Sequence, residues 1–157
     1  MIIKSFELSK LNQQKSKAIL FYGENEGFKN QIIKEYFIDK NKKVERYEES
    51  EILDNYENII TSLLNKSFFD EQKIIIISRV TDKILVFIKE FLLKNIEDVI
   101  LLINSLSLEK KSKLRNFFEK DKSAICIPFY SDEVKTLSSI ANNFFKKLNI
   151  PISREAI

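Results

Sequence analysis

The feature that most constrains this fold is a set of short apolar runs that do not alternate with polar residues. A strand that is apolar at every position is buried on both faces, which is typical of a parallel sheet covered by helices on both sides. We therefore expect an α/β fold with a five-stranded parallel sheet sandwiched by helices. The expected strands are residues 18–22, 44–47 (the weakest), 73–78, 99–103 and 124–128.

Between these runs, apolar residues recur at helical spacing. Helices are predicted at residues 28–38, 51–64, 81–95, 107–118 and 132–149, with Ser107 as the N-cap of the fourth. Phe144 and Phe145, near the end of the last helix, are expected to lie in the core or to pack against a second domain. Ligands of such sheets bind at the carboxyl ends of the strands.

Composition excludes several kinds of chemistry. The 157 residues carry 26 basic and 23 acidic side chains, a balance that does not indicate a protein that coats nucleic acid. Histidine is absent, which excludes Ser-His-Asp catalysis and His-ligated metals. With one cysteine, Cys126, the chain has no intrachain disulfide and no Cys-rich zinc site. We expect no catalytic residues, no metal and no cofactor, and Cys126 in the core.

Two further features concern the surroundings of the protein. The N-terminus lacks a secretory signal, and the longest apolar runs, 74–77 and 99–103, are far too short to span a membrane. We expect a soluble cytoplasmic chain with no membrane partner. The basic run Lys110, Lys111, Lys113 and Arg115 is interpreted as a solvated helix face, with DNA contact as the alternative.

Both glycines of the chain, Gly23 and Gly27, fall in one turn after the first apolar run. A phosphate-binding P-loop would lie here, but a Walker A loop has the form G-x-x-x-x-G-K-[ST]. The two glycines are one residue too close for that form. Gly27 is followed by Phe28 and not by lysine, and Asn30 stands where a hydroxyl is required when the motif is counted from Gly23.

The segment Gly23, Glu24, Asn25, Glu26 and Gly27 is therefore interpreted as a degenerate P-loop that does not bind nucleotide. Glu24 and Glu26 would repel phosphate, and no Walker B acidic pair follows an apolar strand. The glycines are expected to allow positive φ and a close approach of strand and helix.

A pair of phenylalanines lies in a polar turn before the strand at 73–78, in the segment Ser67-Phe68-Phe69. A loop of this kind cannot easily bury both rings in one core. They form either a plug for an apolar pocket on a partner protein or a cap on the sheet edge. Full burial of two Phe side chains is worth about 3–6 kcal/mol, so a plug needs further contacts around it.

These residues, in this order, resemble the N-terminal part of the delta subunit of bacterial DNA polymerase III, the clamp-loader subunit that opens the sliding clamp. Residues 22–26 after the first strand are similar to the family's L-x-G-x-[DE] segment. Residues 67–75 are similar to its S-[LF]-F-x-x-x-[KR]-[LI]-[IV] stretch, and 149–153 to its G-x-x-I-[ST] opening of the second domain. Segments 99–115 and 124–130 add to the resemblance, which covers the whole chain.

The resemblance implies an AAA+ core over residues 1–148 that neither binds nor hydrolyses ATP, and the start of a helical second domain at 149–157. It implies a non-catalytic subunit of the DNA-directed DNA polymerase (nucleotidyltransferase) holoenzyme, which binds and opens the β sliding clamp for loading onto primed DNA. Phe68 and Phe69 would be the wedge, with Ser67 before it and Leu64 where clamp-binding sequences often carry Gln. The delta prime and tau/gamma subunits would be further partners, and DNA an indirect one.

Two other functions stay open at this point. A P-loop-like enzyme with an unorthodox nucleotide site predicts that ATP or GTP raises the melting temperature. A non-catalytic α/β scaffold or receiver-type domain is the other. A receiver needs acidic residues clustered at strand ends, and the sequence pairs Gly23-Glu24 and Ser78-Arg79 there argue against it.

Overall fold

The computed structural model describes residues 2, 16–39, 42–64, 72–96, 98–121, 123–131 and 134–153. Its centre is a five-stranded sheet with the strand order β2-β3-β4-β1-β5, in which all neighbouring strands are parallel. The expected α/β fold is confirmed. The strands are β1 (Ala18–Tyr22), β2 (Lys43–Glu48), β3 (Lys73–Ser78), β4 (Val99–Ser105) and β5 (Ala124–Pro128).

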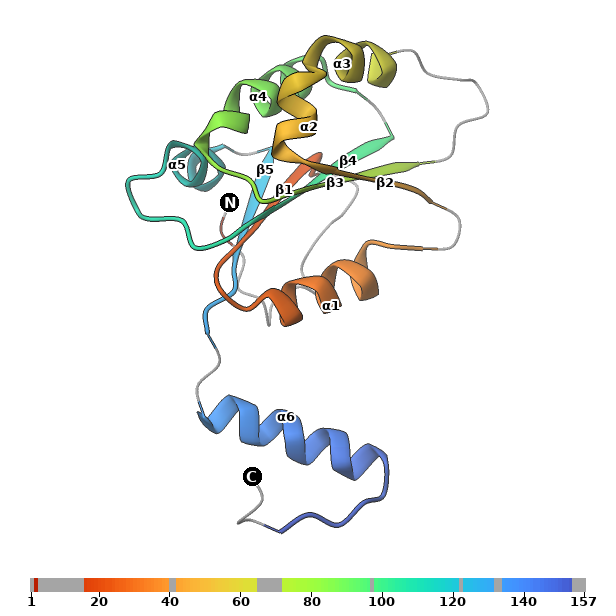
Figure 1. Cartoon of the computed structure of the whole chain (residues 1–157), viewed down its shortest axis with the longest axis vertical. Coiled ribbons are helices and arrows are strands. Elements are labelled where there is room, and N and C mark those ends of the chain that lie inside the picture. The colour runs from red at the N-terminus through yellow and green to blue at the C-terminus, as the bar shows by residue number, and fades with distance from the viewer. Residues whose placement is uncertain are drawn as a thin grey trace.

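Helices cover both faces of the sheet, as Figure 1 shows. On one face lies α1 (Glu26–Tyr36). On the other lie α2 (Glu49–Asp54), α3 (Tyr56–Leu64), α4 (Leu85–Leu93) and α5 (Lys113–Lys120), with a 3₁₀ turn, η2 (Asp82–Ile84), before α4. No helix among these described residues, or in α6 (Val134–Lys147), combines the length and apolar composition that a membrane crossing requires.

The core consists of two hydrophobic clusters, one on each face of the sheet. In β1, Leu20 packs toward α2 to α5, whereas its neighbours Ile19 and Phe21 pack toward α1. Strands β1, β4 and β5 are buried at every position, which is the burial that their unbroken apolar runs predict. Strand β2 lies at the sheet edge and is only partly buried, so its sequence pattern is weak.

Two helix predictions are wrong in detail. The helix expected at 51–64 is broken at Asn55 into α2 and α3, and α2 begins earlier, with the Glu48 N–H donating to Glu51 at 2.7 Å as part of a capping box. The fourth helix does not begin after Ser107. Its N-cap is Ser112, whose hydroxyl accepts from the Arg115 N–H at 3.1 Å, and residues 107–112 form a loop.

Helix α6 follows β5 and lies away from the sheet in Figure 1. It ends in a Schellman motif: Asn149 has φ 56°, and the Ile150 N–H donates to the Phe145 carbonyl at 3.0 Å. Phe144 is 58% exposed, so the expectation of a core position is wrong for this residue. The division into residues 1–148 and 149–157 stays a prediction.

The turn from β1 to α1 requires glycine at one of the two predicted positions. Gly23 has φ 125°, and a Cβ built on it would lie 1.9 Å from the Phe129 carbonyl oxygen. Gly27 is the second residue of α1, where a Cβ would meet nothing closer than Asn25 Oδ1 at 4.0 Å. The expectation of a conformational requirement therefore holds for Gly23 and is wrong for Gly27.

This difference gives a matched pair of variants. Gly23→Ala is expected to lower the free energy of unfolding by about 2 kcal/mol or more, because backbone strain and a clash add together. Gly27→Ala is expected to leave it unchanged or raise it by up to about 1 kcal/mol, since alanine favours the helix. Urea unfolding measures both. Equal effects of the two substitutions would contradict the turn geometry.

Candidate functional site

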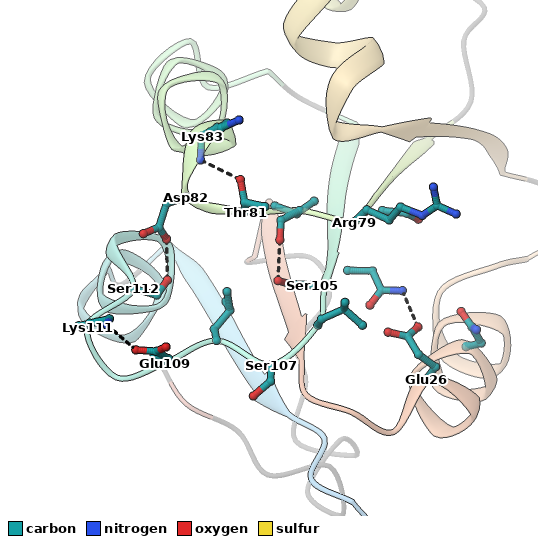
Figure 2. Close-up of a pocket in the computed structure, with 16 residues that line it drawn as sticks. Glu26, Arg79, Thr81, Asp82, Lys83, Ser105, Ser107, Glu109, Lys111 and Ser112 are labelled. Carbon is teal, nitrogen blue, oxygen red and sulfur yellow. Dashed lines mark hydrogen bonds and ion pairs between the residues drawn. The ribbon is translucent and has the colours of Figure 1, made fainter.

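The sheet has a switch point between its neighbouring strands β1 and β4. The chain leaves β1 into α1 on one face and passes from β4 to α5 on the other. Connections that diverge to opposite faces open a crevice at the carboxyl ends of the strands, where ligands of parallel sheets bind. A cavity of about 900 Å³ lies at this edge, shown in Figure 2, and we call it the carboxyl-edge cavity.

Three segments line the carboxyl-edge cavity. They are the first turn of α1, residues 78–83 after β3, and the chain from the end of β4 to the start of α5. The backbone of Arg79, with φ 56°, turns the chain out of β3. The Ser105 hydroxyl donates to the Val80 carbonyl at 2.6 Å, which ties the second segment to the third.

A buried lysine lies beside the position where a phosphate would bind. Lys29 is fully buried, and its Nζ donates to Glu26 Oε1 at 2.6 Å and to the Ser105 carbonyl at 2.7 Å. A phosphate-binding lysine has to be free to reach its ligand, whereas the charge of Lys29 is neutralised within the protein. Sequence analysis did not single out Lys29, because it compared the motif with the residue that follows Gly27; counted from Gly23, Lys29 stands at the position of the Walker lysine.

The turn itself offers little to an anion. Only three residues join β1 to α1, and the N–H groups of Gly23 and Asn25 donate to the carbonyls of Leu106 and Phe129, at 3.2 and 3.4 Å. These N–H groups are therefore already bonded within the protein. A phosphate loop needs such groups free to bind its ligand.

The remaining residues of the predicted degenerate P-loop separate in space. The Asn25 side chain caps α1 by accepting from the Phe28 N–H at 3.1 Å. Glu24 accepts from the Ser131 hydroxyl at 2.6 Å, whereas Glu26 lines the cavity. That this segment binds no nucleotide stays a prediction.

Asn104, near the end of β4, hydrogen-bonds to both neighbouring segments of the cavity wall. Its Nδ2 donates weakly to Glu26 Oε2 at 3.4 Å, and its backbone carbonyl accepts from the Val80 N–H at 3.3 Å. Its Oδ1 is buried and has no hydrogen-bond partner among the residues that the structure describes. In the sequence, Asn104 showed only that no Walker B acid follows the strand. Its hydrogen-bond partners lie far away in the chain, so a sequence pattern cannot show them.

The opposite wall is built around Asp82. One carboxylate oxygen accepts from the Ser112 hydroxyl at 2.6 Å and the Leu114 N–H at 2.9 Å, and the other accepts from the Lys113 N–H at 3.0 Å. The hydrogen bond from Ser112 and that from the Leu114 N–H lower the pKa of Asp82. A carboxylate from another segment therefore decides where α5 begins.

Cys126 offers no reactive thiol. It lies fully buried in β5, as predicted, and burial raises its pKa to about 12, which keeps it protonated at neutral pH. Over the described parts of the chain, no three or more His, Cys, Asp or Glu side chains are placed to hold a metal ion.

The residues of the basic run, predicted as a solvated helix face, differ in their exposure to solvent. Lys111 and Lys113 are exposed, and Lys111 pairs with Glu109 at 2.8 Å. Arg115 is half-buried, with its guanidinium 5.0 Å from the centre of the Tyr22 ring and its Nε donating to Glu119 at 2.7 Å. The prediction is wrong for Arg115, which packs on the end of β1.

The predicted wedge falls largely outside this description. Ser67, Phe68 and Phe69 lie in residues 65–71, which are not among the described residues. Leu64 is the last residue of α3, with 47% of its side chain exposed. Lys73 begins β3 and so lies at the amino edge of the sheet, opposite the carboxyl-edge cavity.

Comparison with known proteins shows only a distant similarity. No protein-family model matches this sequence, and no curated protein matches it. Among solved structures, domain III of the Thermotoga maritima replication initiation protein DnaA is similar, with a TM-score of 0.46 and 13% identity. The match covers 96% of this chain and 70% of that one. A similarity of this size assigns neither a family nor a function.

Lys29→Met tests the internal ion pair. We expect the free energy of unfolding to fall by about 1–3 kcal/mol, because the Ser105 carbonyl loses a buried donor while Glu26 can turn to water. Lys34→Met, at an exposed position of the same helix, is the control and is expected to change it by less than about 0.5 kcal/mol. Equal losses in urea unfolding would contradict the role of Lys29.

The Asp82 cap predicts a dependence on pH. Because the folded-state pKa is lowered, the cap contributes fully above the unfolded-state pKa of about 3.9 and is lost as pH falls through the folded-state value. Asp82→Asn is expected to be less stable than wild type by about 1 kcal/mol from pH 7 to 5. Below about pH 4 the difference shrinks. Urea unfolding across this range measures it, and a constant difference would contradict the cap.

Proposed function

We propose that this chain is the N-terminal part of a non-catalytic clamp-loader subunit of the delta type, which binds and opens a ring-shaped sliding clamp. The observation that carries the proposal is the segment Ser67-Phe68-Phe69, which begins three residues after the half-exposed Leu64 at the end of α3. Large aromatic side chains often anchor protein–protein contacts.

The state of the nucleotide position supports a non-catalytic subunit. The ammonium of Lys29 is held by Glu26 and Ser105, and the N–H groups of Gly23 and Asn25 in the short turn are bonded to protein carbonyls. Binding of a triphosphate would require these bonds to break. A P-loop-like nucleotide enzyme is therefore the weaker alternative.

The arrangement of the sheet is compatible with the AAA+ core that the resemblance implies. It has five parallel strands with helices on both faces. The proposed clamp contact precedes β3 in the sequence, and β3 begins at the amino edge of the sheet. Contacts with the delta prime and tau/gamma subunits would then belong to the full-length protein, whose second domain we propose begins at residues 149–157.

The proposed mechanism is a shift of the clamp between closed and open states. A ligand shifts such an equilibrium only by the difference in its affinity for the two states, and about 5.5 kcal/mol moves it from 1:99 to 99:1. Two fully buried Phe side chains supply about 3–6 kcal/mol before the cost of association. The wedge therefore needs support from contacts around it, and Leu64 is the nearest described candidate.

Calorimetry with the β clamp of the same cell tests the proposal. We expect micromolar binding by wild type and a loss of about 100-fold or more in the Phe68→Ala/Phe69→Ala variant, since each 1.4 kcal/mol is tenfold in affinity. Leu64→Ala is expected to lose about tenfold. The control is Val86→Ala/Leu93→Ala, which removes two aliphatic side chains, 69% and 84% exposed, from α4 and is expected to bind as wild type does.

Each other outcome has a distinct meaning. Equal binding by wild type and the double Phe variant would keep the partner and discard this site. No binding by a folded wild-type chain would reject the clamp-loader function. A rise in melting temperature with ATP or GTP would favour the P-loop-like enzyme instead.

A further inference from the structure

Helix α6 carries apolar side chains that the described part of the chain leaves exposed. Leu137, Phe144 and Leu148 are between 52% and 58% exposed, and Ile150 follows just after the helix at 48%. No described residue of α6 belongs to either hydrophobic cluster of the core, and Figure 1 shows the helix apart from the sheet and from the other helices. Exposed apolar residues that gather in this way mark a surface that binds a partner.

The spacing of these residues is that of a helix that pairs with another helix. Four of them, which we call the α6 stripe, follow one another at steps of four, three and four residues: Leu137, Ala141, Phe144 and Leu148. This alternation places them on one narrow line along the helix, as the core positions of a coiled coil are placed. Because Ala141 is small, a second helix can approach closely at the middle of the stripe.

The charges at the two ends of α6 differ in sign. The sequence places Asp132, Glu133 and Lys135 around the start of the helix, and Lys146 and Lys147 in its last turn. The start is therefore net negative and the end is positive, which complements the dipole of a single helix. The same distribution makes α6 complementary to an antiparallel copy of itself, since the negative end of one helix meets the positive end of the other.

One register of such a pair satisfies the α6 stripe. When Leu137 of one copy lies opposite Phe144 of the other, the two-fold axis repeats this contact at the other end of the pair. Ala141 of each copy then lies close to the axis, where the two helices need the least room. The large side chains of the stripe are thereby distributed on both sides of a small one.

The same register brings opposite charges together. Val134 lies opposite Lys147, because each is three residues further out than the Leu137–Phe144 contact, so Lys147 reaches the position of Glu133 of the other copy. Glu133 and Lys147 are 14 residues apart and share one position of the seven-residue repeat, directly beside the stripe. Lys135 and Lys146 fall at outer positions of the repeat, away from the second helix.

An anionic membrane fits this helix less well. Helices that lie on such membranes carry basic residues along the whole polar face. Between Lys135 and Lys146 the sequence of α6 has no basic residue, and Asp132 and Glu133 would be repelled by anionic headgroups. The charge pattern therefore favours a second copy of the chain over a lipid surface.

We propose that α6 pairs with α6 of a second copy of this chain, in an antiparallel homodimer held together by the α6 stripe. Since α6 has only 14 residues, the interface is small, and we expect a dissociation constant of about 1–100 μM. This interface consists of α6 alone and does not depend on the proposed clamp function.

Sedimentation equilibrium of the full chain, from low to high micromolar concentration, tests the proposal. Wild type is expected to pass from monomer to dimer. Phe144→Glu is expected to weaken the dimer at least tenfold, because the pairing would bury a carboxylate. Asn142→Glu introduces the same residue at an exposed position on the other side of α6 and is expected to dimerise as wild type does. Because Phe144 lies outside both core clusters, the melting temperature measured at low concentration is expected to be the same for all three proteins.

Cross-linking tests the antiparallel register. Chains with Leu137→Cys and chains with Phe144→Cys are expected to form a disulfide with each other on oxidation. Neither variant is expected to cross-link with itself, because equal positions in this register lie about 10 Å apart along the axis, too far for a disulfide. The native Cys126 is fully buried and does not compete.

Several results would overturn the proposal. They are a monomer at every concentration, equal dimerisation of Phe144→Glu and Asn142→Glu, and preferred cross-linking of Leu137→Cys with itself, which a parallel pair would give. A monomeric wild type that binds vesicles of anionic phospholipid, while Phe144→Glu does not, would identify a membrane as the partner instead. None of these results bears on the calorimetry with the clamp, which tests Phe68 and Phe69.

Discussion

Burial of β1 and β4 on both faces is the constraint on which the rest of the structure depends. Strands of this kind need helices on both sides, so the chain has to send α1 to one face and α2 to α5 to the other. Because β1 and β4 are neighbours whose following helices diverge, a crevice opens at their carboxyl ends. The position of the carboxyl-edge cavity is thus a consequence of how the core is buried.

Within that crevice, the charge of the buried Lys29 is paired with a carboxylate of the protein itself. The Lys29 ammonium donates to Glu26 and to the Ser105 carbonyl, and these bonds tie α1 to the end of β4. A phosphate bound at this place would need a free cation. The same network leaves one acceptor, on Asn104, without a partner among the described residues. The proposed clamp contact precedes β3 in the sequence, and β3 begins at the other edge of the sheet.

Strand positions could be predicted because burial on both faces leaves a direct mark on the sequence. The runs at β1, β3 and β5 were located at the residues where the structure has them. The start of α5 could not be predicted, since Asp82 from a distant segment supplies the carboxylate that caps it. The break at Asn55 could not be predicted either, because the apolar spacing of residues 51–64 continues across it.

By itself, the sequence determined the α/β class, the parallel sheet and the need for Gly23 in the first turn, because burial and backbone geometry restrict residue types locally. Only the tertiary structure decided which polar groups meet. Lys29 and Ser105 are 76 residues apart, and Glu26 and Asn104 are 78 apart, so neither pairing leaves a local pattern. The site emerges when the sheet brings strand ends together, which a one-dimensional pattern cannot show.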